Sequence, residues 1–223
     1  MATTVQPTAV AVPKPRGIAK YLAWSIDHKV IGIQYIATSF FFFLVGGFLA
    51  ELIRIELLTP AASLMVDGGA YNTLFTMHGT IMIFLFVVPM LAGFGNYLVP
   101  LMLGQKDMAF PWLNAFAFWM LPPAGLIMLA GWLVGPAQAG WTSYFPLSGP
   151  QFSPFDGQTL WAISLHLIGA SSILGAVNFI VTILNMRPPG MTIWQMPLFV
   201  WATLATSIII LVATPFLAGG LTL

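Results

Sequence analysis

Long apolar runs alternate with short polar segments along most of this chain. Five runs are each long enough to cross a bilayer as a helix, which takes about 20 residues. Their bounds are Val30–Ile53, Leu74–Leu103, Pro111–Val134, Leu160–Leu184 and Pro197–Leu223. The runs lack the alternation of a barrel strand, and an open sheet edge in lipid would leave backbone groups unpaired. The pattern therefore predicts an all-α fold, a polytopic transmembrane helix bundle with five spanning helices.

The positions of the basic residues predict the orientation of the bundle. Short loops that carry Lys and Arg stay on the cytoplasmic side of a membrane. Six of the seven basic residues fall on one side if every run crosses: Lys14, Arg16, Lys20, Lys29, Lys106 and Arg187. Only Arg54 falls on the other side, near the acidic residues Glu51, Glu56 and Asp67. We therefore expect the N-terminus to lie inside.

Residues 1–17 differ from the rest of the chain because they are rich in Pro, Ala, Val and Thr. Their prolines prevent a continuous helix, so we expect a flexible N-terminal tail, followed by a membrane part over residues 18–223. The run that begins at Val30 is longer than the apolar core of a secretory signal and has no small-residue cleavage site behind it. The sequence stops at Leu223, where the fifth run ends, with no polar tail, as we expect of a chain cut out of a longer one.

Composition leads to the same class of protein. The chain is 59% hydrophobic and 6% charged, with a mean hydropathy of +0.93, whereas soluble domains average about 25% charged residues. It has no cysteine, so any metal or haem ligation falls to histidine. The net charge is +1 and the basic residues are scattered, which argues against nucleic-acid binding. We expect an integral membrane protein in contact with lipid.

The second run contains a single ionic or imidazole side chain, that of His78. Such a group is costly in hydrocarbon, so the position predicts a ligand or a paired role; the alternative is a hydrogen bond to a neighbouring helix. Asn96 lies 18 residues further on, which is five helical turns, so both side chains share a face if the helix is straight. The alternatives are a bend of the helix at Pro89 and an interhelical hydrogen bond of Asn96.

A polar stripe marks the fourth run. Its members recur at spacings of seven, seven and four residues: Ser164, Ser171, Asn178 and Thr182. A stripe on one helix face lines either a hydrated path or a contact with another helix, while a serine such as Ser164 can also bond to a carbonyl one turn earlier. His166 lies about 120° from the stripe and belongs to a different site. His28 is expected to be an interfacial residue.

Several motifs occur in an order that resembles a known family. They are Asp27-His28-Lys29, Leu52–Leu57, His78–Phe84, Gly93–Met102, Asp107–Pro111, Gly140–Tyr144, Ser171–Phe179 and Met196–Trp201. On these motifs the chain resembles the N-terminal part of subunit I of the haem-copper oxidases, in the cytochrome c oxidase branch. The resemblance covers nearly everything after the tail and implies the first five transmembrane helices of that subunit, an incomplete domain.

The resemblance also implies residues that bind cofactors. His78 matches an axial ligand of the low-spin haem a, and a neutral imidazole suits haem iron. Arg54 matches the arginine that hydrogen-bonds the formyl group of haem a. Trp141 matches a tryptophan near the propionates of haem a3, and Glu56 matches a carboxylate of a calcium or sodium site.

Proton transfer is the second implied property. Asp107 matches the entrance of the D proton channel of the family; without the resemblance, a solvated loop aspartate is the alternative. The residues that match the channel lining are Asn96, Asn114, Ser171, Ser172 and Asn178. Two residues near the entrance depart from the family, namely Lys106 before the aspartate and Trp112 where an arginine is usual. Both alter the charge at the mouth of the channel.

The resemblance implies a terminal respiratory oxidase, an oxidoreductase and translocase that reduces oxygen to water and pumps protons. Its expected partners are the remaining helices of subunit I, subunits II and III, and cytochrome c as electron donor. The complete oxidase needs two histidines for haem a and four more for haem a3 and CuB, whereas this chain has three histidines. We therefore expect no catalytic residue in this chain and no activity from it alone.

Two alternatives stay open from the sequence. One is a quinol oxidase of the same superfamily, which differs in its electron donor. The other is a non-catalytic haem-binding membrane module that this chain would form independently. The expected location is a bacterial plasma membrane or a related energy-transducing membrane, since the tail does not resemble an arginine-rich transit peptide.

Overall fold

The computed structural model describes residues 17–58, 60, 68–154 and 156–222. All regular structure in this part of the chain is helical, which confirms the predicted all-α class. The elements are η1 (Gly17–Tyr21), α1 (His28–Glu56), α2 (Gly68–Thr80), η2 (Ile81–Val87), α3 (Val88–Met102), α4 (Pro111–Ala130), η3 (Gly131–Leu133), α5 (Gly157–Asn185), η4 (Ile193–Gln195) and α6 (Leu198–Thr222). The predicted tail, apart from Gly17, lies outside the described residues, as does Asp67.

The five predicted spans are confirmed as helices long and apolar enough to cross a membrane. The second span consists of α2, η2 and α3 in continuous succession, from Gly68 to Met102. Helix α1 begins at His28, two residues before the apolar run, because the Asp27 carboxylate caps it by accepting a hydrogen bond from Lys29 N at 2.8 Å. The inside position of the N-terminus stays a prediction.

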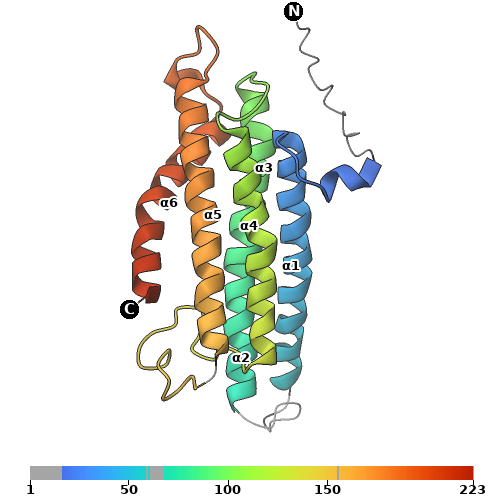
Figure 1. Ribbon diagram of the computed structural model, residues 1–223, viewed down its shortest axis with the longest axis vertical. Helices are drawn as coiled ribbons and strands as arrows, with labels where there is room; N and C mark the ends of the chain where they lie inside the picture. The colour runs from blue at the N-terminus through green and yellow to red at the C-terminus, as the bar shows by residue number, and fades with distance from the viewer. Residues whose placement is uncertain (1–16, 59, 61–67, 155, 223) are drawn as a thin grey trace, which may run out of the picture.

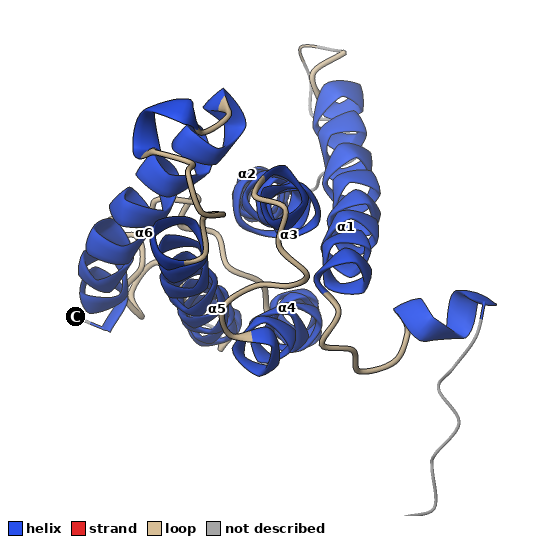
Figure 2. Cartoon of the chain, turned by 90° about the horizontal axis from the view of Figure 1, so that it is seen from above, coloured by secondary structure: helices blue, strands red, loops and turns tan. Residues whose placement is uncertain are grey.

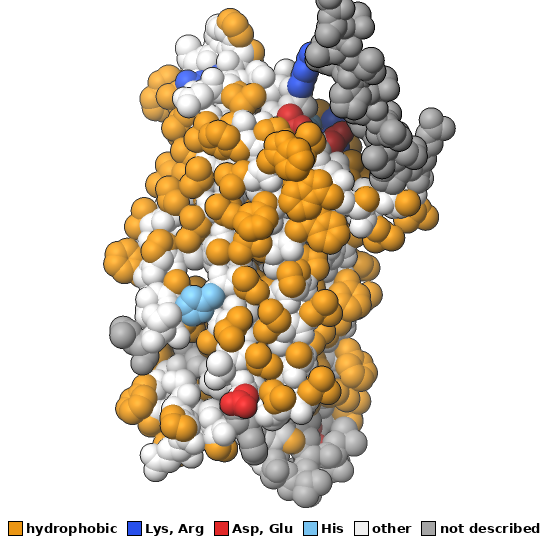
Figure 3. All heavy atoms as spheres, in the orientation of Figure 1, with side chains coloured by type: hydrophobic (Ala, Val, Ile, Leu, Met, Phe, Trp, Pro, Cys, Tyr) orange, Lys and Arg blue, Asp and Glu red, His pale blue; other side chains and the backbone are white. Residues whose placement is uncertain are grey.

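The spans run side by side as one bundle (Figure 1). Seen along the bundle, α2 and α3 lie within an arc formed by α1, α4, α5 and α6 (Figure 2). Apolar side chains cover most of the face drawn in Figure 3, and its charged side chains lie toward the two ends. This distribution is that of a bundle whose middle lies in lipid.

Glycine allows α1 and α3 to approach closely where they cross. A Cβ atom on Gly32 would lie 2.9 Å from Gly93 O, and one on Gly93 would lie 3.0 Å from Gly32 O. Small residues at such crossings let helix backbones pack against one another in membranes. This contact fixes α1 against the second half of the second span.

The second span is not a straight α-helix, because η2 is π-helical. Val88 N donates to Ile83 O, five residues earlier, and Pro89 follows with no N–H to donate. A π-turn adds about one residue, so it turns the side chains on either side by about 100° relative to each other. The straight-helix condition for a common face of His78 and Asn96 is therefore not met.

Candidate functional site

His78 lies on α2, half-buried, with its ring turned toward α1. Its Nδ1 atom is 2.9 Å from the carbonyl oxygen of Gly46. A carbonyl only accepts, so Nδ1 carries the proton and donates, and Nε2 retains its lone pair. A histidine whose Nδ1–H is held by a backbone carbonyl has the tautomer and orientation of a metal ligand that binds through Nε2. The geometry fits a ligand role.

Trp141 packs against the neighbour of His78 in the chain. A Cβ atom on Gly79 would lie 3.3 Å from Trp141 Cδ1, so only glycine leaves the indole this close. The loop is also fixed by Gly140 N, which donates to Thr76 Oγ1 at 2.9 Å. The structure therefore places Trp141 beside the histidine segment, although the two residues are far apart in sequence.

Arg54 and Glu56 lie in the last turn of α1. Arg54 is exposed, whereas Glu56 is buried. Arg54 follows Gly46 by eight residues, which is about 12 Å along the helix axis, so it is not beside His78. Within the described part of the chain, no three His, Cys, Asp or Glu residues come together in a group that could hold a metal ion.

Asp107 lies in the loop between α3 and α4 and is half-buried. Burial raises the pKa of its carboxyl above the ordinary value. The hydrogen bond that its Oδ1 accepts from Met108 N at 2.7 Å, together with the charge and backbone N–H of His28, holds the pKa down, while Asp27 raises it further. A carboxyl in this setting binds a proton more readily than a fully solvated one.

Besides Gln34 Oε1, three buried side chains near this end carry atoms with no hydrogen-bond partner among the described residues. They are His28 Nε2, Asn96 Oδ1 and Asn114 Nδ2. His28 Nδ1 is 2.8 Å from Asn96 O, and Asn96 Nδ2 donates to Ala92 O at 2.9 Å. Buried polar atoms of this kind are usually satisfied by ordered water.

His28 is buried within the bundle, whereas the sequence predicted a residue at the membrane surface. It is 1% exposed, because its ring turns inward to the backbone of Asn96 instead of outward to the membrane surface. Tyr35, seven residues later and thus on the same helix face, is also buried, with its Oη 3.4 Å from Ser171 Oγ. The spacing of seven residues indicated that His28 and Tyr35 share a helix face. A tyrosine within an apolar run, however, does not by itself indicate a site.

The polar stripe of α5 faces α4 and the loop before it. Ser164 Oγ donates to Ala124 O, and Ser171 Oγ donates to Ala117 O, both at 2.7 Å. Ser164 therefore bonds across to another helix and not back along its own. The N-terminal part of the stripe is a contact between helices, which was one of the two alternatives.

The other end of the stripe holds the loop that contains Asp107. Asn178 accepts from Phe110 N at 2.9 Å and donates to Phe110 O at 3.2 Å. Thr182 Oγ1 accepts from Ala109 N at 2.9 Å. These bonds fix the chain two and three residues after Asp107 and so position its carboxyl.

A cavity of about 290 Å³ lies between α1, α3, α4, α5 and α6. Three predicted channel residues line it, Asn96, Ser171 and Ser172, together with Tyr35. Its wall does not include Asp107, Asn114 or Asn178. The structure thus brings half of the predicted channel residues to one cavity and places the others nearer the loop.

These features define an integral membrane protein of several spans, with an intramembrane histidine oriented as a ligand and buried polar groups beside a cavity between the helices. Residues 30–223 match the family model described as cytochrome c and quinol oxidase polypeptide I. The chain belongs to this family.

Individual relatives agree with the family match. The chain is 57% identical over 204 residues to cytochrome c oxidase subunit 1 of Thermostichus vulcanus and 56% identical over 203 residues to that of Synechocystis sp.. Each match covers 91% of this chain and 36% of the relative. A putative cytochrome c oxidase subunit 1-beta of Streptomyces avermitilis is 46% identical over 222 residues, which are 98% of this chain and 39% of the relative. The chain thus spans little more than a third of the length of these curated relatives.

Proposed function

We propose that the chain is the N-terminal, five-helix part of the catalytic subunit of a terminal respiratory oxidase. In the complete subunit, electrons pass through a low-spin haem a to a centre of haem a3 and CuB that reduces oxygen to water, coupled to proton pumping. The observation that carries this proposal is the hydrogen bond between His78 Nδ1 and Gly46 O, which presents Nε2 to a ligand. The family match and the names of the relatives support the same activity.

His78 would hold haem a through the iron. When bound, this group supplies a one-electron carrier. The chain's own part is to hold the imidazole through the bond from Nδ1 to the carbonyl of Gly46, which leaves Nε2 as the nitrogen that would bind the iron. Arg54 would contact the haem a formyl group, and Trp141 would lie near the haem a3 propionates. Glu56 would contribute to a calcium or sodium site.

Asp107 would take up protons at the inner side as the entrance of a D channel. Its raised pKa and its fixed loop suit a group that binds and releases protons. Beyond it, the residues proposed to order water are Asn96, Asn114, Ser171, Ser172 and Asn178. The partnerless atoms of Asn96 and Asn114 and the cavity at Ser171 support this path.

The remaining ligands would come from parts of the subunit that correspond to the unmatched length of the relatives. This chain has three histidines, so by itself it is not expected to reduce oxygen. We propose that it works with the remaining helices, with subunits II and III and with cytochrome c, in a bacterial plasma membrane or a related energy-transducing membrane. A quinol donor is the second candidate, because the family description covers both kinds of oxidase.

The test is a reduced-minus-oxidised visible spectrum of the purified complex with His78→Ala. Loss of the low-spin haem a band is expected. His166→Ala is a matched control, because His166 is also a half-buried histidine within a span, with Nδ1 2.7 Å from Ala162 O in its own helix. An unchanged band in the His78 variant, or equal losses in both variants, would overturn the ligand assignment.

A further inference from the structure

The segment from Gly17 to Ile26, called the arm below, is attached to the bundle by specific contacts. Gln34 of α1 is buried, and its Nε2 donates to Tyr21 O at 3.1 Å and to Ala23 O at 2.9 Å. Trp24 packs on α4, with its ring centroid 6.1 Å from that of Trp112 and 6.4 Å from that of Trp119. The arm is therefore a fixed part of the fold.

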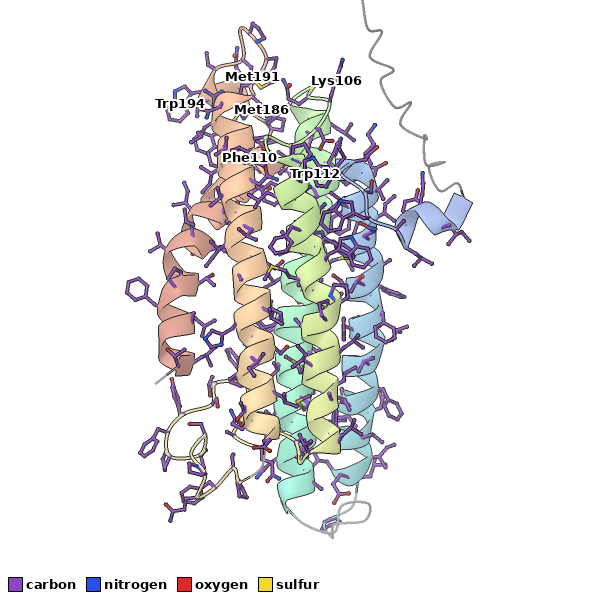
Figure 4. The ribbon with its side chains drawn as sticks, viewed as in Figure 1. Lys106, Phe110, Trp112, Met186, Met191 and Trp194 are labelled. Atoms are coloured by element: carbon purple, nitrogen blue, oxygen red, sulfur yellow. The ribbon has the colours of Figure 1, made fainter. Side chains whose placement is uncertain are left out.

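The arm leaves the bundle sideways. Helix η1 projects sideways from the end of the bundle beside α1, transverse to the spans and away from them (Figures 1 and 2). Lys106 and Trp112 lie at this same end, where α3 passes to α4 (Figure 4). A segment that runs across the spans at the end of a transmembrane bundle lies in the plane of the membrane surface.

The arm combines large exposed apolar side chains with lysines. Ile18 is 80% exposed, Leu22 is 76% exposed and Trp112 beside the arm is 67% exposed. Lys20 is exposed, with Nζ 4.6 Å from the centre of the Tyr21 ring. Lys29 is exposed just beyond the arm. The contact of Trp24 with Trp112 joins the apolar part of the arm to the exposed apolar surface of α4.

We propose that the arm is an interfacial anchor that binds anionic phospholipid of the adjacent leaflet. Ile18, Leu22 and the Trp24–Trp112 pair would lie at the boundary between headgroups and acyl chains, where tryptophan is favoured. Lys20 and Lys29 would bind headgroup phosphates. Asp27 lies between them, but its carboxylate accepts from Lys29 N and caps α1. An anionic phospholipid matches this surface, because its acyl chains suit the apolar side chains and its negative headgroup suits the lysines.

The position of the arm can be measured with fluorophores, since the chain has no cysteine of its own. The complex is reconstituted in lipid nanodiscs with a label at Leu22→Cys, and the unmodified complex supplies the background. Lipids brominated near the headgroup are expected to quench this label at least several times more than a label at Lys106→Cys, which is exposed in the loop between α3 and α4. Equal quenching at the two positions overturns the proposal. A label at Leu22→Cys that neither brominated lipid nor aqueous iodide quenches also overturns it, because a protein then covers the arm.

The charge preference is tested at the same label. Quenching by brominated phosphatidylglycerol is compared with that by brominated phosphatidylcholine, which gives the local preference for anionic lipid. Lys20→Gln and Lys29→Gln are each expected to lower this preference about fivefold, and 1 M salt is expected to lower it as well. Lys106→Gln is the matched control and is expected to leave it unchanged. No preference in the unaltered chain, or no effect of the two lysine variants, contradicts the binding of anionic headgroups.

Discussion

At the scale of single residues, backbone groups do much of the positioning. The ring of His78 is oriented by a carbonyl of α1, and the loop of Asp107 is held by its backbone groups at Ala109 and Phe110. Backbone acceptors are present at every residue, so a sequence pattern cannot indicate which one will be used. This is why the sequence indicates His78 as a candidate ligand and does not indicate the orientation of its ring.

Asp107→Asn removes the ionisable carboxyl of this residue and keeps a side chain of nearly the same shape. The pKa of Asp107 is raised in the folded protein, so its carboxyl adds stability at low pH that is lost as the pH rises through the folded pKa. Asparagine cannot ionise. The variant should therefore unfold at a higher temperature than the original protein at pH 8, with the difference closing as the pH falls toward about 4.

Thermal unfolding in detergent at several pH values checks this expectation. In the complete oxidase, Asp107→Asn should also slow proton uptake from the inner side. A variant that loses stability at pH 8 would contradict the raised pKa, and normal uptake would contradict the entrance role.

At the scale of elements, α1 depends on close contact with the second span. Gly93→Ala adds a Cβ atom 3.0 Å from Gly32 O and 2.8 Å from Ile36 Cγ1, so α1 and α3 must move apart. We expect a loss of about 1–3 kcal/mol in the free energy of unfolding. Gly47→Ala in α1 is the control, because its Cβ would meet no atom within 4 Å.

The control should gain about 0.5–1 kcal/mol, since alanine loses less conformational freedom than glycine within a helix. Both values can be obtained from unfolding in mixed micelles. Equal effects of the two substitutions would show that helix propensity dominates and that the crossing at Gly32 and Gly93 tolerates separation.

The π-helical η2 is the element that sequence periodicity missed. Periodicity assumes 100° per residue along the whole run, and one π-turn breaks that assumption between His78 and Asn96. Pro89 was a signal of irregularity, but a proline can produce a kink, a break or a wider turn. As a result, two side chains of one continuous span point in different directions: His78 bonds to α1, and Asn96 lines the cavity.

At the scale of the whole molecule, the five spans could be predicted because lipid requires long apolar helices whatever their partners are. The cavity could not, since it depends on how five helices come together. The polar stripe of α5 illustrates the limit. Its spacing indicated a common face, yet only the packing of α4 decides that Ser164 and Ser171 bond to carbonyls.

Gly175→Leu tests whether the cavity takes part in proton transfer. Gly175 lines the cavity, and a Cβ atom there would meet nothing within 4 Å. The added side chain should fill part of the space, leave stability unchanged or raise it by up to about 2 kcal/mol, and slow proton uptake in the complete oxidase. Gly169→Leu, whose Cβ would lie 3.2 Å from Thr214 Cγ2, should lower stability instead. Normal uptake with Gly175→Leu would place the path elsewhere.

The bond between His78 and Gly46 also affects which substitutions the protein can tolerate during evolution. The acceptor is a main-chain oxygen, so no exchange of the residue at position 46 deletes it. A Cβ atom at that position would instead lie 2.7 Å from Met82 Sδ, in a flexible side chain on η2. Heritable change at this point can therefore be compensated by a second change at position 82, and drift at the two positions should be correlated. His78 itself cannot be exchanged in this way, because the bond to the carbonyl of Gly46 comes from its ring.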